Sequence, residues 1–203
     1  WWQLAKERID HLTFNGRRQL KHALVYLILR PLVLALPLDT HRAVFSNYWG
    51  QKFSRADGPA TLSLQLAEQD PTFTNVVVAS PKHLKRIRTQ VQQLKPRKAK
   101  IQVIKNASLR FYYNIWRAKY PFNDVNFQLG FRVDKCIEKR PEQIEVQTTH
   151  GIPLKKMGLD SSDAIEPTEH RKFLARSARY DYLVSTSPIV ADVFSKAHNV
   201  TPE

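Results

Sequence analysis

From about Arg42 onward, short runs of β-branched residues alternate with longer segments of helical periodicity. This alternation is typical of strand–helix units that build a parallel sheet, and it constrains the fold more than any other feature of the chain. The expected strands are Arg42–Asn47, Asn75–Ala79, Lys100–Ile104, Phe127–Phe131, Ile144–Thr148 and Tyr182–Thr186. The expected helices are Pro59–Gln69, Lys82–Leu94, Ser108–Ala118, Glu169–Arg179 and Ile189–His198. We therefore predict an α/β fold with a Rossmann-like open parallel sheet, in which ligands gather beyond the carboxyl ends of the strands.

The segment before this alternation, residues 1–40, combines apolar and basic side chains. Ala23–Leu38 is its most apolar stretch, but Arg30 and Pro31 divide it into pieces well short of the roughly 20 residues that a spanning helix needs. The basic and aromatic residues upstream are Lys6, Arg8, Arg17, Arg18, Lys21, Trp1, Trp2 and Phe14. This composition predicts an amphipathic helical segment lying in a membrane interface. A helix packed against its own domain, or against one outside this sequence, is an equally good interpretation of the pattern.

The 203-residue chain carries 32 Lys and Arg against 18 Asp and Glu, a formal net charge of +14. A positive field of that size attracts polyanions: nucleic acid, anionic lipid head groups or a phosphate-bearing substrate. The segment Pro81–Lys100 is rich in Lys and Arg and contains no acidic residue, which favours an anionic partner over a merely solvated face. The single cysteine, Cys136, cannot form an internal disulfide, so a reducing compartment, the cytoplasm, is expected.

The end of the first expected strand carries the first candidate site. The chain there reads Ser46-Asn47-Tyr48-Trp49-Gly50-Gln51-Lys52. Asn47 offers a polar side chain, and Gly50 allows the backbone to approach a ligand closely, so both are candidate substrate-binding residues. The segment matches neither the dinucleotide fingerprint nor the phosphate loop, and a plain connecting turn is the alternative.

The second candidate site follows the strand expected at Ile144–Thr148, where His150 and Gly151 are followed by Lys155 and Lys156. An imidazole of near-neutral pKa can accept a proton from a hydroxyl, and fixed positive charge steadies phosphate oxygens, so this pattern suits a transfer to or from phosphate. A surface loop with ordinary lysines is the alternative. The other histidines show no metal-ligand spacing, and we expect neither a metal site nor a cofactor.

One motif closely resembles the hallmark of the CDP-glycerol glycerophosphotransferase family: Gln147-Thr148-Thr149-His150-Gly151-Ile152-Pro153-Leu154-Lys155-Lys156-Met157-Gly158-Leu159-Asp160. Two further pieces fall in the family's order: Val44-Phe45-Ser46-Asn47-Tyr48-Trp49-Gly50 and Tyr180-Asp181-Tyr182-Leu183-Val184-Ser185-Thr186-Ser187-Pro188. The resemblance extends from about Arg42 to Val200. Thr149 stands where the family usually has tryptophan, and Ile152 where it usually has threonine. These changes are expected to alter the fit of the acceptor without removing the histidine.

The resemblance implies a B-type glycosyltransferase fold, in which residues 41–203 would be the N-terminal, acceptor-side Rossmann-like half. It also implies a monotopic enzyme at the cytoplasmic face of the cell membrane that works in wall teichoic acid synthesis. A hydroxyl of a lipid-linked glycerol-phosphate acceptor would attack the β-phosphate of CDP-glycerol and release CMP. His150 would be the general base. Lys155 and Lys156 would steady substrate phosphate, a role that their charge and position indicate more than the resemblance does, and Gly151 is a further candidate substrate-binding residue.

Residues 1–40 would then hold the enzyme peripherally at anionic lipid. The family's donor-binding half comes after the point that corresponds to Glu203, so we expect the chain to be a fragment that is inactive alone. One alternative is a related transferase of ribitol phosphate or of the polymer's primer. Another is a basic, non-enzymatic nucleic-acid-binding α/β domain, whereas the favoured interpretation has no nucleic-acid partner. The sequence leaves a homo-oligomer open.

Overall fold

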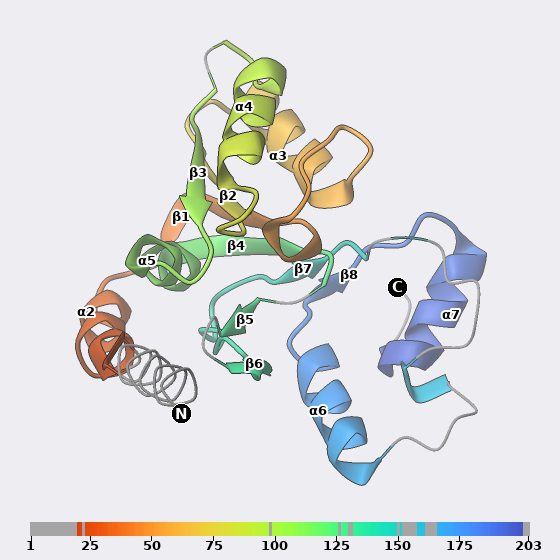
Figure 1. Ribbon diagram of the computed structural model, residues 1–203. Coiled ribbons are helices and arrows are strands. Elements are labelled where there is room, and N and C mark those ends of the chain that lie inside the picture. The colour runs from red at the N-terminus through yellow and green to blue at the C-terminus, as the bar shows by residue number, and fades with distance from the viewer. Residues whose placement is uncertain are drawn as a thin grey trace, which may run out of the picture.

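The computed structural model describes residues 20–21, 23–97, 99–125, 127–129, 132–149, 151, 158–160 and 166–200. Figure 1 shows an open sheet at its centre, with strand order β3-β2-β1-β4-β7-β8 and every neighbouring pair parallel. Its strands are β1 (Asp39–Ser46), β2 (Thr74–Ala79), β3 (Ile101–Lys105), β4 (Ala118–Asn123), β7 (Val146–Gln147) and β8 (Tyr182–Leu183). The predicted α/β fold with a Rossmann-like parallel sheet is confirmed.

The helices are η1, a π-helix (Leu24–Leu29), α2 (Arg30–Leu34), α3 (Gly58–Gln69), α4 (Leu84–Leu94), α5 (Leu109–Arg117), α6 (Pro167–Ser177) and α7 (Pro188–His198), with short 3-10 turns η2 (Tyr48–Gly50) and η3 (Gly158–Asp160). Helices α3 and α4 cover one face of the sheet and α5 covers the other, whereas α6 and α7 lie at its β8 end (Figure 1). Strand β2 shows how the layers form, because successive side chains of a strand point to opposite faces. Val76 and Val78 join the core beneath α5, whereas Val77 and Ala79 join the core beneath α3 and α4. The sheet is therefore the middle of three layers.

Local sequence signals explain several helix boundaries. Ser108 caps α5 by accepting a hydrogen bond from Phe111 N at 3.2 Å. Pro188 is the first residue of α7, a position where the missing N–H of proline is harmless, and Ser187 caps that helix. Asn199 adopts a left-handed conformation with φ of 53° and ends α7. The predicted helices are all present, with boundaries that shift by a few residues at most.

Strand β4 is the element that the sequence pattern failed to predict. A strand was expected at Phe127–Phe131 instead, and that prediction is wrong for the central sheet: Gln128–Leu129 (β5) pairs antiparallel with Arg132–Cys136 (β6) in a separate ribbon. Pro121 hides β4, because proline is normally a sign against a central strand. Here β7 pairs only with Phe122 and Asn123, so Pro121 has a sheet neighbour on the β1 side alone.

The N-terminal helical segment continues through Pro31 without a break, since α2 follows η1 directly. The π-helical bonding of η1, in which Arg30 N donates to Val25 O, widens the turn just before the proline ring. Val25 and Val33 are buried in the core with Trp116, so one side of the helix packs against the domain. The other side exposes large apolar residues: Leu20, Leu24, Leu27, Ile28, Leu32 and Leu36. In the part of the chain that the structure describes, no helix combines the length and apolar character needed to cross a bilayer.

Candidate functional site

A cavity of about 390 Å³ opens at the carboxyl ends of β1 and β4. After β1 the chain continues towards β2 and β3, and after β4 it continues towards β7 and β8, so the loops that follow these two strands diverge. Such a switch point is where open α/β sheets bind ligands. The cavity is lined by Asn47, Tyr48, Lys52, Ala56, Asp57, Gly58, Asp124, Thr148, Thr149, Gly151, Thr186 and Val190.

Asn47 follows the last residue of β1 and lines the cavity. Its side chain is only 5% exposed, and Nδ2 has no hydrogen-bond partner among the described residues. Buried polar groups are nearly always paired, so an unpaired donor on a residue that lines a cavity is a candidate to meet a ligand acceptor. The placement agrees with the candidate role of Asn47 in substrate binding, which stays a prediction.

Two helices begin at this cavity. Gly58, the first residue of α3, and Val190, in the first turn of α7, both line it. The amino ends of helices carry partial positive charge and unpaired N–H groups, and both features favour anions such as phosphate. Lys52 adds a full positive charge, and its Nζ lies 5.1 Å from the centre of the Tyr48 ring.

Two carboxylates lie in the same cavity. Asp124 follows β4 directly, is buried, and accepts a hydrogen bond from Tyr48 N at 2.7 Å. Asp57 precedes α3, and its Oδ2 accepts a hydrogen bond from Ser54 Oγ at 2.7 Å. Carboxylate oxygens accept hydrogen bonds from hydroxyls, so the cavity offers anion-binding groups together with groups suited to a polyol.

The second candidate segment reaches the same cavity. Thr149 and Gly151 both line it, and they are the sequence neighbours of His150 on either side. His150, Lys155 and Lys156 lie outside the described residues, and their expected roles stay predictions. Gly151 has φ of 155°, a backbone conformation that residues other than glycine rarely adopt. A Cβ added there would meet no atom within 4 Å. The two strand ends singled out in the sequence are thus brought together.

Gly50 has a structural reason to be glycine. It is buried with φ of 74°, and an added Cβ would lie 2.6 Å from Ser80 N and 2.8 Å from Val78 O. Its carbonyl accepts a hydrogen bond from Ser80 N at 2.7 Å, which fastens the turn after β1 to the end of β2. Gly50 is not among the residues that line the cavity, and its candidate role in substrate binding stays a prediction.

Sequence reasoning did not single out Lys52, Asp57 or Asp124. Lys52 lies in the first candidate segment, and Asp57 begins the sequence Asp57-Gly58-Pro59, which is typical of a helix start. Both residues could therefore have been singled out from the sequence. Asp124 could not be found, because the strand before it was not predicted.

The basic segment Pro81–Lys100 lies at α4, away from the cavity lining. Lys82, Lys85, Arg86 and Arg88 are exposed, and none of the ion pairs among the described residues involves them. Arg86 is tied to the turn after β1, since its Nη2 donates to Gln51 O at 2.6 Å. Across the described part of the chain, no three His, Cys, Asp or Glu side chains gather as a metal ion would require.

An open parallel sheet with a cavity at its switch point defines a Rossmann-like α/β domain, and the groups that line this cavity suit an anion. A family model described as "CDP-Glycerol:Poly(glycerophosphate) glycerophosphotransferase" matches residues 28–203, and the chain belongs to this family. The family indicated by the sequence is confirmed. The fold corresponds to one Rossmann-like half of a B-type glycosyltransferase.

Relatives named for teichoic acid synthesis match parts of the chain. It is 32% identical over 99 residues to the teichoic acid glycerol-phosphate transferase of Staphylococcus aureus, covering 46% of this chain and 24% of that protein. It is 25% identical over 178 residues to the teichoic acid poly(glycerol phosphate) polymerase of Bacillus spizizenii, covering 85% of this chain and 41% of that protein. The chain therefore spans less than half the length of these relatives.

The solved structures of the wall teichoic acid polymerase TagF share the fold. One superposes with a TM-score of 0.67 at 19% identity, covering 92% of this chain and 45% of TagF. A TagF variant soaked with CDPG gives a TM-score of 0.66 at 19% identity, covering 93% of this chain and 45% of that one. At this identity the likeness speaks for the fold alone.

Proposed function

We propose that the full-length protein to which this chain belongs transfers glycerol phosphate from CDP-glycerol to a lipid-linked acceptor in teichoic acid synthesis. One observation carries the proposal. Thr149 and Gly151, which flank His150 in the sequence, line the same cavity as Asn47 and the first turns of α3 and α7, and Asn47 has a donor that is unpaired among the described residues. Family membership supplies the substrate class, and the names of the relatives supply the polymer.

In the proposed reaction, His150 takes the proton of an acceptor hydroxyl as that oxygen attacks the β-phosphorus of CDP-glycerol. A new O–P bond forms to the glycerol phosphate, the bond from the β-phosphorus to the oxygen shared with CMP breaks, and CMP leaves. Lys155 and Lys156 offset the negative charge that builds on the phosphate oxygens. Asn47 and Lys52 add a donor and a positive charge at the described wall of the cavity.

This chain covers less than half of the polymerases it resembles, and we propose that most of the CDP-glycerol site belongs to the part it does not cover. This chain would then supply the acceptor site and the general base, His150. On this proposal the 203-residue chain alone releases no CMP, and the acceptor is held by the hydroxyl-binding carboxylates, Asp57 and Asp124.

We further propose that the enzyme sits peripherally on the cytoplasmic face of the cell membrane. The support is the exposed apolar side of the N-terminal helix, since a large exposed apolar patch marks an interaction surface. A helix held on one side by Val25 and Val33 is fixed to the domain, so burial of its other side in lipid would fix the cavity at the membrane where a lipid-linked acceptor lies.

The test is release of CMP from CDP-glycerol by the full-length protein, with a lipid-linked glycerol-phosphate acceptor, against its His150→Ala variant. We expect activity in the parent protein and a fall of roughly 100-fold or more in the variant. Parallel assays with CDP-ribitol, and with a primer lipid as acceptor, separate the related transferases. An inactive parent protein that binds generic DNA in a salt-sensitive way would instead favour the nucleic-acid-binding alternative.

A further inference from the structure

We propose that a series of linked side chains, the partly buried Arg179 and the buried Glu145, Asn123 and Gln147, positions the backbone of Thr149 and thereby the segment that carries His150. These four are positioning residues, since none of them lines the cavity. The inference rests on the proposed function for its catalytic consequence, but the positioning itself can be measured without activity.

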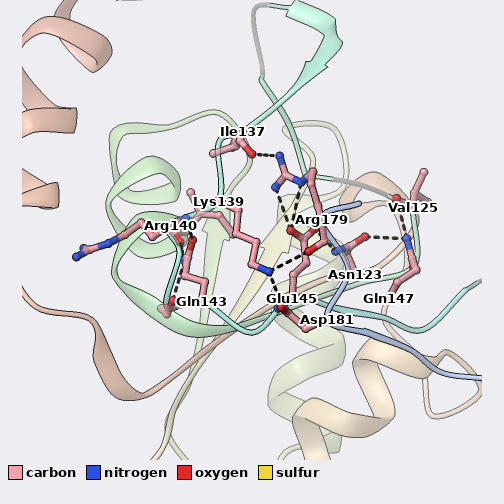
Figure 2. Close-up of polar contacts among 12 residues, drawn as sticks. Asn123, Val125, Ile137, Lys139, Arg140, Gln143, Glu145, Gln147, Arg179 and Asp181 are labelled. Atoms are coloured by element: carbon pink, nitrogen blue, oxygen red, sulfur yellow. Dashed lines mark hydrogen bonds and ion pairs between the residues drawn. The ribbon is translucent and has the colours of Figure 1, made fainter. Parts of the chain in front are cut away.

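The four side chains form an unbroken series of hydrogen bonds, most of which Figure 2 shows. Arg179 Nη2 lies 3.0 Å from Glu145 Oε2, and Asn123 Nδ2 donates to Glu145 Oε1 at 3.1 Å. Gln147 Nε2 then donates to Asn123 Oδ1 at 3.1 Å. At the end of the series, Thr149 N donates to Gln147 Oε1 at 3.1 Å.

The carboxylate of Glu145 gives the series its direction. A carboxylate only accepts, so the Asn123 amide must turn its NH₂ group towards it and its oxygen towards Gln147. Gln147 must then donate through Nε2, which also bonds Val125 O at 3.1 Å, and this leaves its Oε1 for Thr149 N. The ion pair with Arg179 thus determines which atom meets the backbone at the cavity.

Thr149 needs such a partner. It has φ of 56°, and a β-branched residue in the left-handed region is strained unless its surroundings hold it there. Strain of this kind persists at sites where backbone geometry matters to function. The hydrogen bond from Thr149 N to a nearly fully buried glutamine supplies the restraint one residue before His150.

The charged end of the series is itself firmly held. Glu145 is 1% exposed, and burying an ion pair costs desolvation energy that an apolar pair would avoid. Arg179 also donates to Ile137 O, and Glu145 N donates to Asp181 Oδ2 at 2.6 Å, so the ion pair is fixed to neighbouring loops from two directions. A buried polar network this well satisfied rigidifies its surroundings.

The chain contains a matched control for Gln147. Gln143 is another buried glutamine, at 3% exposure against 4% for Gln147. Its Nε2 donates to two backbone carbonyls, of Ile115 and Ala118, and its Oε1 accepts from a backbone N–H, that of Arg140. Only Gln147 connects to the cavity. Gln143→Met therefore removes the same kinds of bonds without touching the proposed positioning.

The experiment compares Gln147→Met with Gln143→Met in the full-length protein, by hydrogen exchange of the Thr149 amide and by the kinetics of CMP release. We expect the Gln147 variant to exchange at least roughly 10-fold faster at Thr149, and its kcat to fall roughly 10- to 100-fold with little change in KM. The Gln143 variant should lose stability but keep parental exchange at Thr149 and parental kcat. Unchanged exchange at Thr149 in the Gln147 variant would overturn the positioning.

A third variant, Gln147→Glu, adds a pH signature that a purely structural role would not produce. Its ionised carboxylate cannot donate to Asn123 Oδ1, whereas the protonated acid can, so the ratio of variant to parental kcat should rise as pH falls. A flat ratio would contradict the donor role of Nε2. If the parental protein released no CMP at all, the proposed function would fail, and Thr149 exchange in the two Met variants would still decide the positioning.

Discussion

Tyr48 N donates to Asp124 Oδ1 at 2.7 Å, which ties the turn after β1 to the residue that follows β4. Both residues line the cavity, so this bond joins its two walls. Asp124→Ala would remove the acceptor of the Tyr48 N–H, and it should lower the free energy of unfolding by about 1–3 kcal/mol. Asp124→Asn keeps an oxygen acceptor and should cost less. Denaturant unfolding of both variants checks the order, and an Ala variant as stable as the parent would contradict it.

Asn47 and Asn75 form a second informative pair. Both are buried, but Asn47 Nδ2 has no partner among the described residues, whereas Asn75 Nδ2 donates to Ser63 O at 3.2 Å. Asn47→Ala should therefore cost little stability yet raise the KM for the acceptor roughly 10-fold, because it removes a hydrogen bond to substrate alone. Asn75→Ala should lower stability and leave the KM for the acceptor unchanged. Steady-state kinetics with thermal unfolding separates the two effects, and equal stability losses would refute the ligand-directed donor.

Gly50 should be among the least replaceable residues. In Gly50→Ala the new Cβ would lie 2.6 Å from Ser80 N, a backbone atom, in a conformation with φ of 74°. The clash and the backbone strain together should cost about 2–4 kcal/mol. Gly151→Ala is the matched control, since no atom lies within 4 Å of its added Cβ and only strain remains. Similar unfolding free energies for the two variants would show that contact with β2 is not the reason for Gly50.

The fold could be predicted from the sequence because alternating strand and helix patterns are local. Strand β2 is indicated by the apolar run Val76–Ala79, and the start of α7 is indicated by Ser187 and Pro188. Strand β4 could not be predicted, because Pro121 is normally a sign against a strand. The strands that pair with β4, β1 and β7, are also distant in sequence. Asp124 was lost with β4.

The candidate site, too, could be predicted only in part. Asn47, His150 and Gly151 could be singled out because each lies at or just beyond the end of an expected strand and within a recognisable motif. Asn47 and Gly151 line one cavity, and the role of His150 stays a prediction. The hydrogen-bonded series that ends at Thr149 was not predicted. Its members come from three separate regions of the chain, and only folding brings Arg179 next to Glu145 and Asn123.

The exposed side of the N-terminal helix gives a prediction for membrane binding. Leu27 is 76% exposed and Leu32 is 63% exposed, so Leu27→Gln with Leu32→Gln should leave folding almost unchanged. The double variant should bind vesicles roughly 10-fold more weakly or worse, because each leucine loses the favourable burial in lipid. Co-sedimentation with vesicles rich in phosphatidylglycerol measures this, and Val33→Gln, on the buried side, should instead destabilise the fold. Parental binding by the double variant would exclude this surface.

His198 makes the α6–α7 region sensitive to acid. Its ring stacks on Phe173 with centroids 5.1 Å apart, Nδ1 lies 3.2 Å from Ser177 Oγ, and burial lowers its pKa below the usual 6.5. The unfolded chain then binds more protons than the folded one between the two pKa values, so stability is complete above about pH 6.5 and falls as the pH drops below it.

The comparison of parental protein with His198→Gln isolates this contribution, because the two proteins differ at this residue alone. We expect the parent to lose more unfolding free energy than the variant between pH 7 and pH 5, while the variant is less stable at pH 7 through lost packing against Phe173. Denaturant unfolding at several pH values provides the measurement. Parallel curves for the two proteins would mean that protonation of His198 is not coupled to unfolding, and that the acid sensitivity arises from other groups.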